Sequence, residues 1–445
     1  RSTPRTSATL DPAAEAALLD AVDVVLTTRE RAIRAGDEQT YAALLADPTA
    51  GRGSVLLRQF ATLAAVPWAE LRHDHPRLSR TPTATPSGTG SRGATTVDVL
   101  VPTTWRLAGE RADTHAEEGF TVTLVGGADG GWRIVDHTAP ITAAAPWWAP
   151  GAGVTNAAHG LVVGTVDEVT RTAYAQWVER AHELAVAAWP SGAPMPPLVV
   201  VAPATATDYL AWSKAAAGTD QVAAVTDGPL DATGRAVADR VLLNPDALAR
   251  PSPDGRAFVI AHEAVHVRLR AELAGQAPLW LSEGFADHVA YAATGLTPTT
   301  IAADALAPVR AGNLPTRLPD HGDFNAEAAT IGPTYQRSWV LVTLLVDRHG
   351  VEAVREFIRA AAIPGTQADA EAAADRALVS VLGTTRAQLL SDWQARLHAI
   401  MENWFRWVCD NPSTDVFKRL LPTFRPSRAA AISAPRPKNN TRASF

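Results

Sequence analysis

The stretch that decides the fold reads Phe-Val-Ile-Ala-His-Glu-Ala-Val-His-Val-Arg-Leu over residues 258–269. Its apolar residues recur at helical spacing, which predicts a helix with one face in a core. His262 and His266 then share a face of that helix, where both imidazoles can reach one metal ion. Glu263 projects beside them and is placed to take a proton from metal-bound water.

A His-Glu-x-x-His motif can also arise by chance. With 12 His among 445 residues, a random match is expected roughly once or twice per hundred such chains. The segment Leu-Trp-Leu-Ser-Glu-Gly-Phe-Ala-Asp at 279–287 argues against chance, because Pro278 predicts a second helix that can present Glu283 as an oxygen ligand. Two His and one Glu leave tetrahedral zinc a fourth position for water, which is the catalytic arrangement.

Asp287 follows Glu283 by one helical turn and is suited to hold the far ring nitrogen of a zinc-binding histidine, His262 in our interpretation. Asp287 or His288 could instead replace Glu283 as the third ligand, and this alternative stays open. The sequence thus predicts one Zn²⁺ per chain.

The paired motifs resemble those of the gluzincin metallopeptidases of the MA clan, the thermolysin and aminopeptidase N type, and most of all the bacterial peptidase MA-like domains. The resemblance covers about residues 155–400, including the ending at 382–393. It implies a peptidase acting on a peptide or protein, with Glu263 as general base and then acid, and with the zinc ligands His262, His266 and Glu283. It also implies that a strand just before the zinc helix lines the substrate, for which residues 241–244 are the candidate.

The chain departs from this family pattern in two places. Sixteen residues separate His266 from Glu283, slightly fewer than is usual, which shortens the loop without changing the ligands. The Gly-x-Met-Glu-Asn segment that holds the substrate amine in such aminopeptidases is missing, and residues 401–403 spell part of it far downstream of the zinc helix. Amine-directed exopeptidase activity is therefore unsupported.

Besides the metal, the reaction needs a hydrogen-bond donor to the negatively charged oxygen that develops on the substrate carbonyl in the transition state. Tyr335 is our candidate, at the N-terminal turn of a helix expected over residues 333–349. Related enzymes place a Tyr on a helix downstream of the glutamate ligand. The alternatives are a Tyr that only completes the packing, and Arg337 as the donor.

Composition excludes several other classes of protein. The chain is 47% hydrophobic and 19% charged, so it can bury real cores, and its net charge of −6 offers no basic field for a nucleic acid. A single cysteine, Cys409, excludes an internal disulfide framework and a Cys-based zinc cluster. The longest apolar runs, such as residues 339–346, are far shorter than the roughly 20 residues of a transmembrane helix.

The length predicts two or three domains of an α+β protein. Helical patterns at 11–36, 38–46 and 54–72 precede strands between residues 96 and 136, an order that resembles the small NTF2-like cone. We expect an NTF2-like domain (1–140), a linker (141–158), a zincin-type catalytic domain with a small sheet (159–296), an all-helical C-terminal part (297–400) and an atypical basic tail (401–445).

Apart from His288, the histidines outside the His-Glu-x-x-His motif are not expected to bind a metal. His73 and His75 resemble a metal pair, but they border an expected loop with no third ligand nearby. His137, like the remaining scattered histidines, is expected at the surface or as a capping residue.

The rival class is a binding protein, whose N-terminal domain captures a ligand while the peptidase-like region is a metal-bearing scaffold with little activity. Zinc-dependent hydrolysis of a non-peptide bond is a third reading. Because the chain begins at Arg1 without Met, we expect a preceding signal peptide or lipid anchor, and with it a secreted or cell-envelope location. Three lysines against 37 arginines indicate a G+C-rich bacterial coding sequence.

Overall fold

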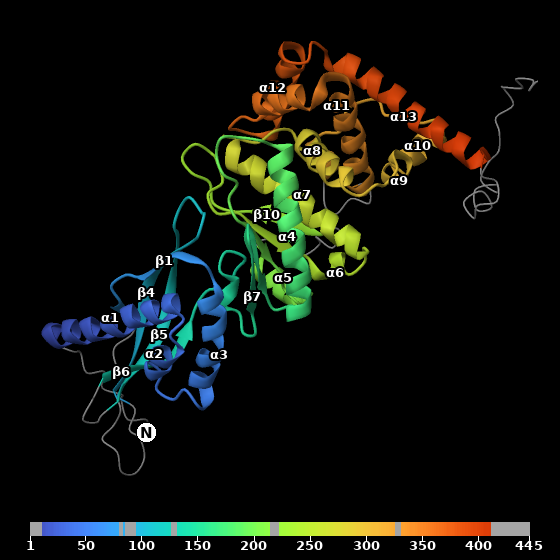
Figure 1. Ribbon diagram of the computed structural model, residues 1–445. Helices are drawn as coiled ribbons and strands as arrows, with labels where there is room; N and C mark the ends of the chain where they lie inside the picture. The colour runs from blue at the N-terminus through green and yellow to red at the C-terminus, as the bar shows by residue number, and fades with distance from the viewer. Residues whose placement is uncertain are drawn as a thin grey trace, which may run out of the picture.

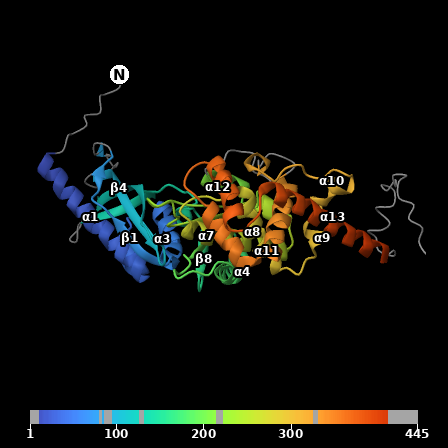
Figure 2. The same ribbon diagram turned by 90° about the horizontal axis from the view of Figure 1, so that it is seen from above.

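The computed structural model describes residues 11–79, 83–84, 95–125, 131–213, 222–324 and 331–410, with the backbone alone at 83–84, 95 and 404–410. Most of the predicted tail, residues 411–445, and the Cys409 side chain lie outside this description. Two sheets and a helical C-terminal part follow one another along the molecule (Figures 1 and 2). The predicted α+β class is confirmed.

The N-terminal part is an antiparallel sheet packed against three helices. The sheet has the order β1-β4-β5-β6, and two short strands also pair with β4. The helix expected over 54–72 ends at Ala65, because Pro67 disfavours helical backbone at Val66, and β1 follows directly. The elements are α1 (Pro12–Ala35), α2 (Glu38–Ala43), α3 (Gly51–Ala65), β1 (Trp68–His73), β2 (Arg77–Leu78), β3 (Thr83–Ala84), β4 (Thr95–Leu107), β5 (Thr114–Val125) and β6 (Gly131–Thr138).

The second sheet has the order β10-β11-β9-β8-β7, with parallel pairing among its three inner strands and antiparallel pairing at both edges. Helices α4, α5 and α6 connect or follow its strands. The elements are β7 (Gly153–Ala157), β8 (Gly160–Gly164), α4 (Glu168–Ala188), β9 (Leu198–Val201), α5 (Ala206–Trp212), β10 (Ala224–Asp227), β11 (Arg240–Leu243) and α6 (Pro245–Leu248).

The segment predicted as a linker, residues 141–158, is packed instead of extended. Trp147 and Trp148 form a short 3₁₀ turn, η1 (Pro146–Trp148), and both are buried in the N-terminal core. The same segment ends in β7, which closes one edge of the second sheet. The apolar surface of two tryptophans explains the difference, since burying it outweighs the loop tendency of the Ala- and Pro-rich sequence around it.

The second sheet belongs to two cores at once. Val200 and Val241 face α4 and helix α7 (Pro253–Glu272), whereas Val199 and Val201 pack into the N-terminal core. Burial on both faces explains the continuous run Leu-Val-Val-Val of β9.

Across the same boundary, the buried guanidinium of Arg240 on β11 pairs with Glu110. Arg111, next to Glu110, donates to the carbonyl oxygens of Ala236 and Ala271 at 2.9 and 2.7 Å. The N-terminal part is thus firmly attached to the sheet behind α7.

Residues 279–410 are mainly helical. Gly350, with φ of 80°, breaks α11, so the two helices expected over 333–349 and 351–362 follow one another within this element. None of the described helices is both long and apolar enough to cross a membrane. The elements are α8 (Leu279–Ala292), α9 (Pro298–Ile301), α10 (Leu306–Arg310), η2 (His321–Phe324), α11 (Ile331–Ala361), α12 (Gln367–Ser380) and α13 (Arg386–Asp410).

Gly284 lets α8 and α11 approach closely. A Cβ at this position would lie 2.5 Å from the carbonyl oxygen of Ser338 and 2.7 Å from a methyl group of Val342, so a larger residue would push the helices apart. This contact fixes the neighbour of Gly284, Glu283, relative to α11.

Candidate metal and catalytic site

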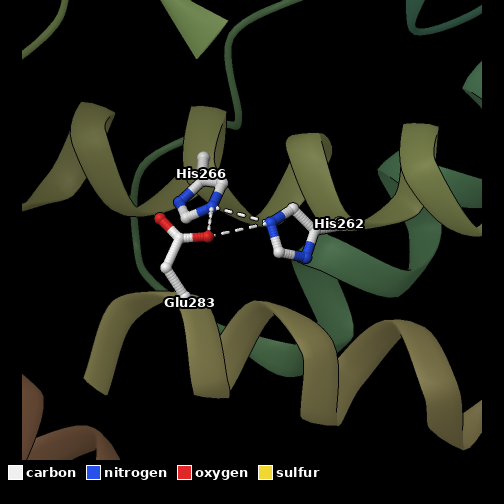
Figure 3. A group of neighbouring side chains, drawn as sticks. All are labelled: His262, His266 and Glu283. Carbon is white, nitrogen blue, oxygen red and sulfur yellow. Dashed lines mark hydrogen bonds and ion pairs between the residues drawn. The ribbon is translucent and has the colours of Figure 1, made fainter. Parts of the chain in front are cut away.

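Two helices supply the central residues of the site. α7 begins at Pro253, and the Ser252 side chain caps it by accepting from the backbone N–H of Gly255. α8 begins directly after Pro278. Figure 3 shows His262 and His266 on α7 pointing toward Glu283, which rises from α8.

Three ligand atoms converge between these helices. The Nε2 atoms of His262 and His266 are 3.0 Å apart, and the Oε2 atom of Glu283 lies 3.1 and 3.2 Å from them. Tetrahedral zinc with bonds of about 2.0–2.1 Å places neighbouring ligand atoms about 3.3 Å apart, so the spacing fits this metal. Within the described ranges, no other group of three or more His, Cys, Asp or Glu residues has this convergence.

Asp287 lies on the other side of the His262 ring. Its Oδ1 atom is 2.9 Å from Nδ1 of His262, so a proton on Nδ1 is held there and Nε2 is left free to bind a metal. This carboxylate is 4% exposed. The contact is the one that the spacing of Glu283 and Asp287 predicts.

The charges of the site favour a cation. Burial alone would lower the pKa of His262, but the hydrogen bonds to Asp287 and Glu283 raise it well above its usual value. Burial would likewise raise the pKa of Glu283, yet the nearby charges of His266 and His262 hold it below its usual range. The carboxylates of the buried Asp287 and the half-buried Glu283 therefore favour positive charge in this space, which a divalent metal ion would supply.

The positions of Asp287 and His288, the two alternatives to Glu283 as third ligand, differ from that of Glu283. His288 points away, because its Nδ1 atom lies 3.0 Å from the hydroxyl of Thr343 on α11. Asp287 faces Nδ1 of His262 instead of the space where the three ligand atoms meet.

Glu263 has a partner that the sequence analysis missed. The hydroxyl of Thr226, on β10, donates to Oε2 of Glu263 at 2.6 Å. Glu263 is 7% exposed, and it lines the same hollow as the three candidate ligands. Because the partners are far apart in sequence and on different kinds of element, no local pattern identifies Thr226.

The strand beside the site is β10, not residues 241–244 as predicted. β11 lies inside the sheet, between β10 and β9, so its backbone groups are engaged on both sides. β10 forms the edge, and Ala224 and Thr226 line the hollow at the candidate ligands. The prediction failed because residues 222–226 and 240–244 both read as strands, and their order in the sheet is not visible in the sequence.

Tyr335 lies in the first turns of α11 and reaches the site. Its ring centroid is 6.2 Å from that of His262 and 5.4 Å from that of Phe324. The negative charge of Glu283, followed by burial, raises the pKa of Tyr335 well above its usual value, so its hydroxyl stays protonated. Arg337 lines neither of the two hollows that meet at the site.

His137 is not a surface or capping residue, and this corrects the sequence analysis; His73, which borders the expected loop, is buried as well. Both are buried inside the N-terminal part, where His73 Nδ1 is 2.7 Å from Glu30 and His137 Nε2 is 2.7 Å from the fully buried Glu118. His75, in contrast, is exposed. Burial raises and His137 lowers the pKa of Glu118, and the net result is a pKa far below its usual range.

Comparison with known proteins adds no relative: no family model matches the chain, and neither a curated protein nor a solved structure is significantly similar to it.

Proposed function

We propose that the chain is a zinc metallopeptidase of the gluzincin type that hydrolyses peptide bonds. The observation that carries the proposal is the convergence of His262, His266 and Glu283 in one hollow with the carboxylate of Glu263. A metal-bearing scaffold needs ligands but has no use for a carboxylate fixed beside them. The binding-protein alternative therefore leaves Glu263 and its bond to Thr226 unexplained.

Each residue of the site has a role in this proposal. Bound zinc would lower the pKa of a water molecule and polarise the substrate carbonyl. Glu263 accepts the proton of that water and passes it to the leaving amine, while Thr226 holds the carboxylate in place. Tyr335 donates its hydroxyl proton in a hydrogen bond to the developing oxyanion. Asp287 orients His262.

We assign a domain type to each of the two folded parts. A curled antiparallel sheet covered by α1, α2 and α3 supports an NTF2-like N-terminal domain. The sheet with β10 at its edge, together with α7 and α8, supports a zincin-type catalytic domain.

The first experiment measures metal by mass spectrometry in protein purified without added zinc. About one zinc per chain is expected, because the ligand set is complete within a single chain. Protein that contains zinc is then offered peptides and matched esters, so that peptidase activity is distinguished from hydrolysis of other bonds. Absence of bound metal after zinc is supplied would contradict the proposal.

Replacing Tyr335 by Phe is expected to lower kcat by about 10- to 1,000-fold and to leave the zinc content unchanged. The substitution removes the hydroxyl and keeps the ring that packs against Phe324. Steady-state kinetics and metal analysis of the same preparation check this. An Arg337→Gln variant is the matched control and retains its activity; unchanged turnover in Tyr335→Phe would remove Tyr335 from the mechanism.

Replacing Thr226 by Val is expected to lower kcat by about 10- to 100-fold, because a hydrogen bond to a charged group contributes about 1.5–3 kcal/mol. Val keeps the shape of the side chain but cannot donate to Glu263. Thr226→Ser keeps the donor and should retain most of the activity, with KM and zinc content unchanged in both variants. Equal rates for the Val and Ser variants would show that Thr226 does not position Glu263.

A further inference from the structure

The candidate ligands lie in the middle of a groove. A hollow of about 670 Å³ and another of about 290 Å³ both include His262 and Glu263 in their lining. The larger hollow extends along α7 toward its C-terminal end, past Leu269. The smaller hollow extends toward the N-terminal end of the same helix, past Phe258. The hollows therefore extend to opposite sides of the ligands, over about 16 Å at 1.5 Å per residue of helix. This length matches about five residues of extended chain.

The edge strand β10 follows the same groove. Ala224 lines both hollows, while Ala223 lines the smaller and Thr226 the larger. β10 pairs with β11 along one side, and no strand in the part of the chain that the structure describes pairs with its other side. Backbone groups at a strand edge can pair with any extended peptide, whatever its side chains, and need no chain terminus.

The described residues that line the hollows offer no receptor for a chain terminus. Their charged side chains are Glu263, Glu283, Asp287 and Arg270. The three carboxylates are engaged within the site itself. Arg270 donates two hydrogen bonds to Asp239, at 2.9 and 3.1 Å. A terminal ammonium needs a free carboxylate and a terminal carboxylate needs a free cation, and neither is present among these residues.

We infer that the substrate is an interior segment of a polypeptide, bound on both sides of the cleaved bond, so that the protein is an endopeptidase. The inference rests on the proposed function and specifies which part of a polypeptide is the substrate. Zinc sites of this kind serve both terminal and interior cleavage, and the groove around the ligands decides between them.

The first test uses the full-length zinc-containing protein and quenched peptides of about ten residues, long enough to fill the groove. Each peptide is supplied with free ends, N-acetylated, C-amidated and capped at both ends, and mass spectrometry locates the cut. Capped and free forms should be cut at the same interior bond with rates within about twofold, since no terminus is bound. A requirement for one free end would overturn the inference and leave the peptidase proposal intact. If no form is cut, both proposals fall.

The second test blocks each side of the groove in turn. Gly332 lines the smaller hollow and has no atom within 4 Å of an added Cβ, and Leu230 lines the larger and is 55% exposed, so both sites tolerate a larger residue. Gly332→Trp and Leu230→Trp should each lower kcat/KM for the doubly capped peptide by about fivefold or more, with zinc content unchanged. Val379→Trp, at a 58% exposed position on α12 outside both hollows, is the control. An effect on one side alone would indicate a terminus-directed enzyme and contradict the inference.

Discussion

Replacing Glu263 by Gln should abolish peptide cleavage while the protein keeps one zinc per chain. Gln has the shape of Glu but cannot accept the proton of the attacking water, and a general base contributes about 10²- to 10⁴-fold to the rate. The amide can still accept the hydrogen bond from Thr226, so the local packing is preserved. Cleavage of a capped peptide and metal content are measured on the same preparation.

The matched control for Glu263→Gln is a carboxylate on the same helix that lies outside the metal site. Glu272, at the end of α7, lies 3.3 Å from Arg268 and lines neither hollow. Glu272→Gln should retain both zinc and activity. A Glu263→Gln variant that cleaves at the rate of the unaltered protein would exclude Glu263 as general base, and the binding-protein reading would then be favoured.

The local part of the site could be predicted because it depends on helical spacing. His262 and His266 stand four residues apart, and Glu283 and Asp287 likewise, so the sequence places each pair on one face of a helix. What it could not supply is the way the two helices approach one another. That depends on contacts such as Gly284 against Ser338, which join distant segments.

The predictions that differ from the structure share a physical cause. Each depends on contacts between different elements of the fold. Residues 141–158 have the composition of a linker, but the burial of Trp147 is decided by a core formed elsewhere in the chain. The polar environments of His73 and His137 likewise require elements that meet only in the folded protein, α1 and β1 for His73 and β5 and β6 for His137. Thr226 belongs to the same group, since its role follows from the position of β10 at the sheet edge.

Replacing His266 by Ala should remove zinc binding and, with it, the stabilisation that zinc gives to the folded protein. A ligand present at 1,000 times its dissociation constant stabilises the folded state by about 4 kcal/mol, which corresponds to a rise in Tm of at least about 5 °C. The unaltered protein should show this rise when zinc is added after chelation, and His266→Ala should show none. Differential scanning calorimetry and metal analysis check the result without any substrate.

His288 provides the control that makes this experiment specific. It is a half-buried histidine on α8, one residue after Asp287, and it bonds to Thr343 instead of facing the ligand atoms. His288→Ala should lower the starting Tm through that lost bond but keep the zinc-dependent rise. Loss of the rise in His288→Ala and its survival in Glu283→Gln would make His288 the third ligand. The opposite pattern, which the 3.1 and 3.2 Å distances favour, assigns that role to Glu283.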